Sequence, residues 1–215
     1  QYIITFFKLT RNINLTITLM KRIVLFTFTM LLGIFCYAQS EHLKFSGIPI
    51  DGTINQFQAK IVQKGYVYNK LYSEAISNGV RCFDGTFVGN KVGLYVYYDE
   101  QTKKVYRVKA VINNISEELA DQKYQMIQQL LQRKYEDCYF QEDKKENKPS
   151  LTIYASRYEL PSEEEPIWKE CFGRIDIFIS QNETIYNYPY IYNVHIDYWD
   201  QINTDKHENK LLDEL

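Results

Sequence analysis

The strongest constraint on the fold is an order of elements that occurs twice along the chain. A short amphipathic helix is predicted over 53–64 and a longer one from Ser116 to about Tyr135. Each helix precedes about four segments in which apolar and polar residues alternate, as in strands. Because short loops join these segments, antiparallel pairing is favoured. The sequence therefore predicts an α+β fold of two tandem α-ββββ repeats, with an antiparallel sheet and both helices packed on one face.

The helices have recognisable signals at their ends. Thr53 and Gln56 form a capping-box pattern, Gly65 follows the first helix, and Ser116 can cap the second. The second helix has a continuous apolar stripe, formed by Ala120, Tyr124, Ile127, Leu131 and Tyr135. We expect each stripe to face the sheet.

The alternation in two central strands predicts which side chains face the core. Over 104–112, the apolar set is Tyr106, Val108, Ala110 and Ile112. Over 91–98, it is Val92, Leu94, Val96 and Tyr98. The polar stretches 142–150 and 161–166 are predicted to be solvated loops. The segment 204–215 is expected to be a polar tail that is frayed or carries a last helical turn.

The N-terminal residues have the pattern of a leader peptide and are not expected to belong to the folded domain. Met20-Lys21-Arg22 precedes an apolar run and then Ala38, which is the pattern of a secretory signal peptide. We therefore expect 1–19 to be an upstream non-native extension and 20–38 to be the signal peptide. The first repeat then spans 41–114 and the second 115–203.

The leader predicts export to the periplasm or the medium. Its apolar run is short for a bilayer span, so no stable membrane span is expected after cleavage. Cys36 leaves a lipoprotein as an alternative, although the bulky Phe35 before it argues against lipid attachment.

The net charge of the chain limits the classes of partner that it is expected to bind. The chain has 25 basic and 27 acidic side chains and a net charge of −2. Loss of the leader removes four basic residues and no acidic one, which leaves a net charge of −6. A moderately acidic protein of this kind is not expected to bind nucleic acid or an anionic membrane surface.

Three cysteines remain after cleavage: Cys82, Cys138 and Cys171. An oxidising compartment permits a disulfide among them, and the odd number leaves one thiol over. Their spacing does not match a zinc site. We expect one structural bridge or three buried thiols, and no catalytic role.

No catalytic motif is recognisable in the sequence. We therefore expect that the protein is not an enzyme and binds no cofactor. It has no nucleophile elbow, phosphate loop or dinucleotide fingerprint. His195 and Asp197 lie two residues apart on a predicted strand, so both point to one face. A metal site would need a third ligand, and none is evident nearby. Metal ligands are therefore not predicted, and an ordinary strand histidine is the preferred interpretation.

Tyrosine is abundant, with 19 residues in the chain, and it provides the best candidate for a binding surface. Tyr95 and Tyr97 lie on the strand face opposite the core set, and Tyr190 and Tyr192 alternate in a later strand. Rows of exposed tyrosine suit recognition of a protein or a glycan. The alternative is that these residues fill half-buried sheet positions.

Several motifs carry a resemblance that covers roughly 41–203. They are Leu43–Thr53, Lys64–Tyr66, Gly85–Gly89, Gly173–Ile177 and Val194–Asp200. These segments resemble a family of exported bacterial proteins of unknown function. The order of elements resembles the tandem helix-plus-sheet architecture of the beta-lactamase inhibitor proteins. The resemblance implies a fold, and no binding residue is carried over from it.

Together these features predict an exported, non-catalytic binding or inhibitory module that uses an aromatic-rich sheet face. Its partner would be a protein or glycan in the cell envelope or medium. Two alternatives stay open. One is a metal-dependent or other hydrolase centred on His195 and Asp197, and the other is a structural envelope component.

Overall fold

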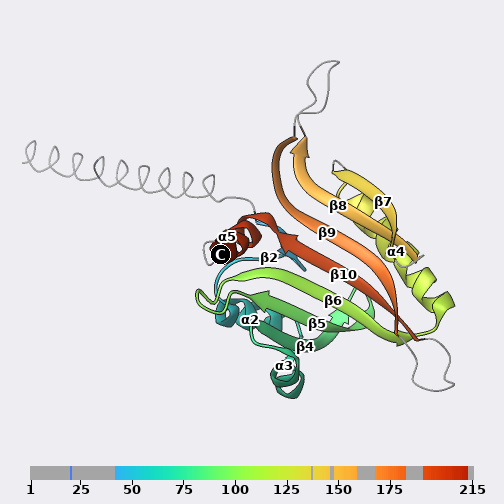
Figure 1. The fold of residues 1–215 in the computed structure, drawn as a ribbon, viewed down its shortest axis with the longest axis horizontal. Coiled ribbons are helices and arrows are strands. Elements are labelled where there is room, and N and C mark those ends of the chain that lie inside the picture. Colours follow the sequence, from blue (N-terminus) through green and yellow to red (C-terminus); the bar gives the residue numbers. More distant parts are fainter. Residues whose placement is uncertain are drawn as a thin grey trace, which may run out of the picture. The chain divides into compact units, whose positions relative to one another are not determined.

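The structure is a computed structural model, and it describes residues 20, 42–136, 138–145, 148–158, 168–182 and 191–212. The predicted leader, apart from Met20, and the predicted loop 161–166 lie outside these residues. From His42 onward the chain forms one compact unit, whose elements are shown in Figure 1.

The first half of this unit contains two helices and six strands. They are β1 (Lys44–Phe45), β2 (Ile48–Pro49), α2 (Ile54–Gln63), β3 (Val67–Tyr68), α3 (Lys70–Ile76), β4 (Val80–Phe87), β5 (Asn90–Tyr98) and β6 (Val105–Ile115). The second half begins with the long helix. Its elements are α4 (Glu117–Lys134), β7 (Tyr139–Lys145), β8 (Lys148–Tyr158), β9 (Trp168–Asn182), β10 (Ile191–Asp200) and α5 (Gln201–Leu212).

Eight of the strands form one sheet in the order β3-β4-β5-β6-β10-β9-β8-β7. All neighbouring pairs are antiparallel. Each half supplies four strands, and the halves meet where β6 pairs with β10 (Figure 1). The predicted α+β class with an antiparallel sheet is confirmed. The residue boundaries of the two repeats stay a prediction.

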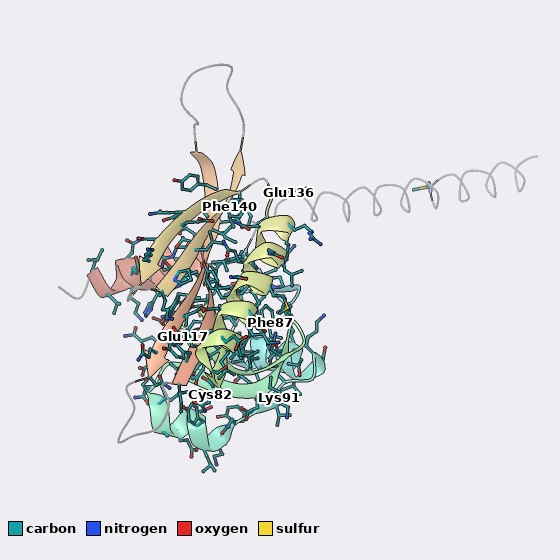
Figure 2. The ribbon with its side chains drawn as sticks, turned by 90° about the vertical axis from the view of Figure 1, so that its right-hand side faces the viewer. Cys82, Phe87, Lys91, Glu117, Glu136 and Phe140 are labelled. Carbon is teal, nitrogen blue, oxygen red and sulfur yellow. The ribbon has the colours of Figure 1, made fainter. Side chains whose placement is uncertain are left out.

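Helices α2 and α4 cover the same face of the sheet. Phe57 of α2 and Ile127 of α4 join one apolar cluster with Leu94 of β5 and Ile177 of β9, and all four are at most 1% exposed. Figure 2 shows α4 lying along the sheet between Glu117 and Glu136, with side chains filling the space between helix and strands. We call this helix-covered side the covered face.

The predicted helix signals are confirmed. Thr53 Oγ1 accepts from Gln56 N at 3.4 Å, and Gln56 Oε1 accepts from Thr53 N at 2.9 Å, so the capping box is complete. Gly65 has a φ of +92°, a conformation that glycine adopts at helix ends without steric cost. Ser116 Oγ accepts from Leu119 N at the start of α4.

The predicted orientation of Tyr106 is wrong. Val108, Ala110 and Ile112 face the core as expected, but the register between β5 and β6 shifts between Tyr97 and Tyr98. Val105, which pairs with Tyr98, is fully buried. Tyr106 is an extra residue between two paired positions, and it forms a bulge. Tyr106 therefore leaves the core and stacks on His207 of α5, with ring centroids 4.4 Å apart.

The predicted loop over 142–150 is also wrong, because most of it belongs to the hairpin of β7 and β8. β7 is an edge strand, and charged side chains at such a position protect a sheet from pairing with other chains. Helix α3 was not anticipated. Its only buried residue is Ser73, so it has no apolar stripe that periodicity could detect.

The polar C-terminal segment is a docked helix rather than a frayed tail. Asp200 is fully buried, and its carboxylate accepts from Asn203 N at 3.0 Å, from Leu43 N at 2.9 Å and from His42 Nδ1 at 3.0 Å. Asn203 Nδ2 donates in turn to Ile50 O and Val105 O. These bonds tie α5 to the first residues of the compact unit.

Within the described residues, no helix is both long enough and apolar enough to cross a membrane.

Candidate binding face

The side of the sheet opposite α2 and α4 is here called the open face. Because side chains alternate along a strand, residues that precede and follow the core positions point to it. Tyr95 and Tyr97 of β5 lie there, as the alternation predicts, and both are half-buried, which the alternative interpretation expects. Helix α3 borders this face at β4, where the rings of Tyr72 and Tyr95 meet edge to face at 6.2 Å.

One row of residues crosses the open face from β5 to β7. Strand register places its members side by side: Tyr97, Arg107, Trp199, Arg174, Tyr154 and Tyr139. Aromatic and guanidinium groups alternate over the first five positions. Such cross-strand neighbours are close enough to interact directly.

Arg107 is the centre of this row. Its guanidinium lies 4.4 Å from the Tyr97 ring centroid and 3.8 Å from that of Trp199. The same group donates to both carboxylate oxygens of Asp197, at 2.8 and 2.5 Å. The Arg174 guanidinium lies 5.0 Å from a ring centroid of Trp199. Three cation–π contacts and a bidentate ion pair therefore hold these side chains in fixed positions.

Two carboxylates lie directly opposite each other in the next row, where Asp197 pairs with Asp176. Each has its own compensating partner. Arg107 binds Asp197, whereas Asp176 accepts from Arg174 Nε at 3.1 Å and from Thr152 Oγ1 at 2.8 Å. The open face therefore displays fixed polar groups without an excess of either charge.

His195 and Asp197 point to the same face, as predicted, but neither bonds to the other in the contacts described. His195 Nε2 lies 2.7 Å from Ser180 Oγ, and its ring stacks on Phe178 at 4.6 Å. Both Asp197 oxygens are engaged by Arg107. Within the residues that the structure covers, no group of three His, Cys, Asp or Glu side chains has the arrangement of a metal site.

A hollow of about 520 Å³ lies on the open face between α3 and the first residues of β10. Asparagine amides and tyrosine rings make up much of its lining. The described lining includes Asn69, Asn113, Asn114, Asn182, Asn193, Tyr72, Tyr95 and Tyr97. Gly93 and Val111, which pair across β5 and β6, also line it. A side chain at Gly93 would occupy part of this space.

An apolar rim adjoins the hollow on α3 and β3. Leu71 is 83% exposed and Val67 68% exposed, and Tyr72 and Ile76 are also exposed. Tyr72 lines the hollow as well. Exposed apolar groups that cluster in this way are typical of interaction surfaces.

The cysteines differ in their surroundings. Cys82 is a buried free thiol, and burial raises its pKa to about 11, so it stays protonated and unreactive at neutral pH. Cys138 is half-buried. The side chain of Cys171 lies outside the described part of the chain, and a bridge that includes it stays a prediction.

The other two predicted tyrosines do not join Tyr95 and Tyr97. Tyr192 is 5% exposed and belongs to the apolar cluster of the covered face, because it lies in phase with the core residues Val194 and Ile196 in the alternation of β10. Tyr190 lies outside the described residues. A binding role for Tyr192 on the open face is therefore not supported.

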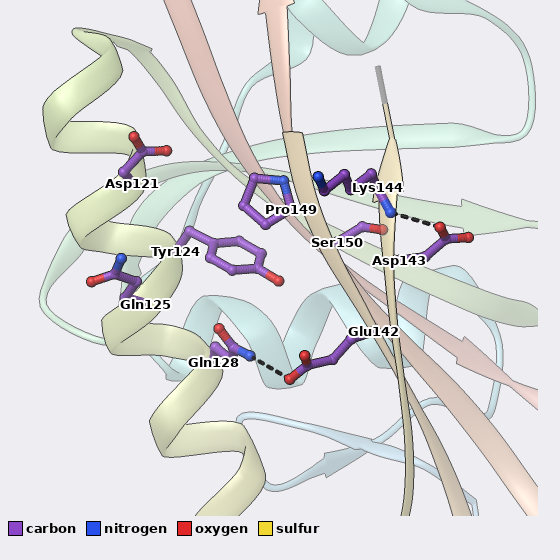
Figure 3. A pocket seen from close by; sticks show the side chains of 9 residues that line it. All are labelled: Asp121, Tyr124, Gln125, Gln128, Glu142, Asp143, Lys144, Pro149 and Ser150. Atoms are coloured by element: carbon purple, nitrogen blue, oxygen red, sulfur yellow. Dashed lines mark hydrogen bonds between the residues drawn. The ribbon is translucent and has the colours of Figure 1, made fainter. Parts of the chain in front are cut away.

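A second hollow, of about 540 Å³, lies between α4 and the β7–β8 hairpin. Figure 3 shows the Tyr124 ring pointing into it and Gln128 donating to Glu142, at 3.3 Å. Burial raises the pKa of Tyr124 to about 12. Asp121 and Asp143 complete an acidic lining that is far less aromatic than the open face.

Sequence reasoning missed Arg107, Trp199 and the asparagines of the hollow. The alternation over 104–112 already places Arg107 opposite the core positions, and Trp199 is out of phase with the apolar residues Val194 and Ile196. Their contact with each other depends on the pairing of β6 with β10, which joins residues 92 positions apart along the chain. No signal within either strand specifies that pairing.

Comparisons with known proteins give no match: no family model, no curated protein and no solved structure is significantly similar to this chain.

Proposed function

We propose that this protein is an exported, non-catalytic binding module that holds its partner on the open face of its sheet. The partner is a protein or glycan of the cell envelope or the medium, and inhibition of an exported enzyme is one version of this role. Export rests on the signal-peptide pattern over 20–38.

The single observation that carries the proposal is the construction of the open face. Helices α2 and α4 both pack on the covered face, while Tyr97, Arg107 and Trp199 are held in a fixed row on the opposite side. A fold needs one buried face for stability. Rigid aromatic and arginine side chains on the other face are the groups that dominate binding energy in interfaces, because little side-chain entropy is lost when they bind.

The proposal can be tested with the exported protein and its variants. We expect the wild-type protein, immobilised and exposed to envelope and medium fractions, to retain a discrete partner. Tyr95→Ala and Tyr97→Ala together should lower that affinity by about tenfold or more. Tyr68→Ala is the matched control, because the Tyr68 ring contacts Phe83 on the covered side of the sheet. Equal retention by all three proteins would contradict the proposal.

The geometry favours a binding module over a hydrolase centred on His195 and Asp197. In such an enzyme Asp197 would orient the histidine or a metal, yet its two oxygens bind Arg107. A structural envelope component would associate with copies of itself. Light scattering that gives the same monomeric mass at all concentrations would count against that alternative.

A further inference from the structure

We infer that the hollow beside Tyr95 is a binding site for a neutral oligosaccharide. This inference rests on the proposed binding role of the open face and names the chemical class of its ligand. It adds to the proposed function, because it depends on three further features of the hollow: its asparagine amides, its floor at Gly93 and Val111, and its charge.

The size and the floor of the hollow suit a short chain of sugar rings. Its volume of about 520 Å³ falls within the range of about 300–1,000 Å³ that is common for small-ligand sites. Gly93 lets the Asn113 amide and the Tyr95 ring lie close to the floor, since a Cβ at Gly93 would lie 3.3 Å from Asn113 Nδ2 and 3.5 Å from the Tyr95 ring. The glycine is not required by the backbone, because its φ lies outside the left-handed region. The missing side chain at Gly93 therefore matters because it accommodates these two lining residues.

Amide groups give the hollow its chemical character. Each asparagine side chain carries two N–H donors and an oxygen acceptor, which matches sugar hydroxyl groups that both donate and accept. Asn193, 7% exposed, accepts from Asn114 N and donates to Asn182 Oδ1, each at 3.0 Å. These bonds fix the Asn193 amide before a ligand arrives, so less entropy is lost on binding.

The charges of the lining favour a neutral ligand. Asp84 supplies a carboxylate and Lys109 an ammonium group among the described lining residues, and Asp84 also accepts from Asn69 Nδ2 at 2.8 Å. A site for phosphate or an acidic sugar would need clustered cations. The centre of a protein–protein interface is normally apolar, whereas this lining is rich in amides.

The tyrosines provide the apolar part of the site. Tyr95 and Tyr97 lie two residues apart on β5, and Tyr72 approaches Tyr95 from α3. An aromatic ring has a negative face, and the C–H groups on the apolar side of a pyranose ring can pack against it. Burial raises the pKa of Tyr95 and of Tyr97, so both phenols remain neutral hydrogen-bond donors.

The inference can be tested with neutral trisaccharides of glucose, xylose, mannose, galactose and N-acetylglucosamine. The acidic comparison is trigalacturonic acid. Saturation-transfer NMR detects binding at about 5 mM sugar, and calorimetry then measures the affinity. We expect at least one neutral trisaccharide to bind. Gly93→Val, which fills the floor, and Tyr95→Ala should each weaken it by about tenfold or more.

Two matched variants complete the experiment. Tyr68→Ala makes the same chemical change away from the hollow, and Leu71→Ala removes the exposed side chain of the apolar rim; both should retain sugar binding. Circular dichroism checks that Gly93→Val is folded, and Tyr95→Ala provides an independent variant if it is not.

The outcomes separate this inference from the proposed function. If no neutral trisaccharide binds, if only trigalacturonic acid binds, or if folded Gly93→Val and Tyr95→Ala bind sugar as the wild type does, the inference is overturned. A protein partner that depends on Tyr95 and Leu71 in the same preparation would then leave the proposed function standing. If neither sugar nor any envelope component depends on Tyr95, both fail.

Discussion

The two faces of the sheet are built from the same strands but from different chemistry. On the covered face, Val108, Ile177 and Ile196 are fully buried beneath α2 and α4. On the open face, Arg107 and Asp176 occupy the intervening positions and are held by ion pairs and ring contacts. The comparison shows how one alternating pattern can place an apolar packing surface on one side of a sheet and fixed polar and aromatic groups on the other.

The difference has an energetic consequence. Burial of aliphatic side chains stabilises a fold by removing apolar surface from water, and the covered face does this. Partly exposed ion pairs contribute less to stability, so substitutions on the open face should cost less. Each prediction below tests that contrast, from the largest expected effect to the smallest.

Phe57→Ala should have the largest effect on stability. Phe57 is fully buried between α2 and the sheet, and truncation of a buried phenylalanine costs about 3–5 kcal/mol in the free energy of unfolding. Chemical denaturation measures this loss. Tyr95→Ala is the open-face counterpart and should cost about 1 kcal/mol. Equal losses in the free energy of unfolding at the two positions would contradict the predicted difference in stability between the two faces.

Arg107→Met should have an intermediate effect, because it leaves the carboxylate of Asp197, which is 3% exposed, without its bidentate partner. We expect a loss of about 2–4 kcal/mol in the free energy of unfolding. The double variant Arg107→Met with Asp197→Leu should recover much of it. If the double variant were as unstable as the sum of the single variants, the ion pair would not be the cause.

Asp99→Asn should have a smaller, pH-dependent effect. Burial by itself raises the pKa of Asp99, but hydrogen bonds from Thr102, His207 and Lys210 outweigh it and lower that pKa below its ordinary value of 3.8. The wild-type carboxylate should therefore add about 1–2 kcal/mol of stability near neutral pH.

The direction of this pH dependence follows from the lowered pKa. Such a group stabilises the fold above its unfolded pKa, and the benefit disappears as the pH falls through the folded pKa. Urea denaturation of both proteins between about pH 5 and about pH 2 should show their stabilities converging. A difference that grows on acidification would contradict the assignment.

Tyr97→Phe should have the smallest effect. It retains the ring that lies 4.4 Å from the Arg107 guanidinium and removes only the hydroxyl, so the free energy of unfolding should change by less than about 0.5 kcal/mol. Tyr97→Ala should cost about 1 kcal/mol more than Tyr97→Phe, because it also removes the cation–π contact. Equal stability of the two variants would mean that the ring contact contributes nothing.

Local signals in the sequence account for most of the covered face. The capping box at Thr53 and the stripes of α2 and α4 were predictable, since each depends on residues within a few positions of one another. Tyr106 was misplaced because a bulge depends on how two strands pair. Helix α5 was missed although Asp200, a favourable N-cap residue, directly precedes it.

The open face could be predicted only in part. Alternation places Tyr95 and Tyr97 on it, but the row from Tyr97 to Trp199 exists only after β5, β6 and β10 have paired in register. The hollow likewise combines α3, β5 and β10, which are distant in the sequence. Contacts that depend on such long-range pairing leave no local pattern.

Hydroxyl-radical footprinting of the free and the partner-bound protein tests the central claim most directly. If the open face is the binding surface, partner binding should protect Tyr95, Tyr97 and Trp199 from oxidation. Leu119 and Leu130, exposed on α4, should react equally in both states. Protection confined to these leucines, with the open-face side chains unchanged, would contradict the account.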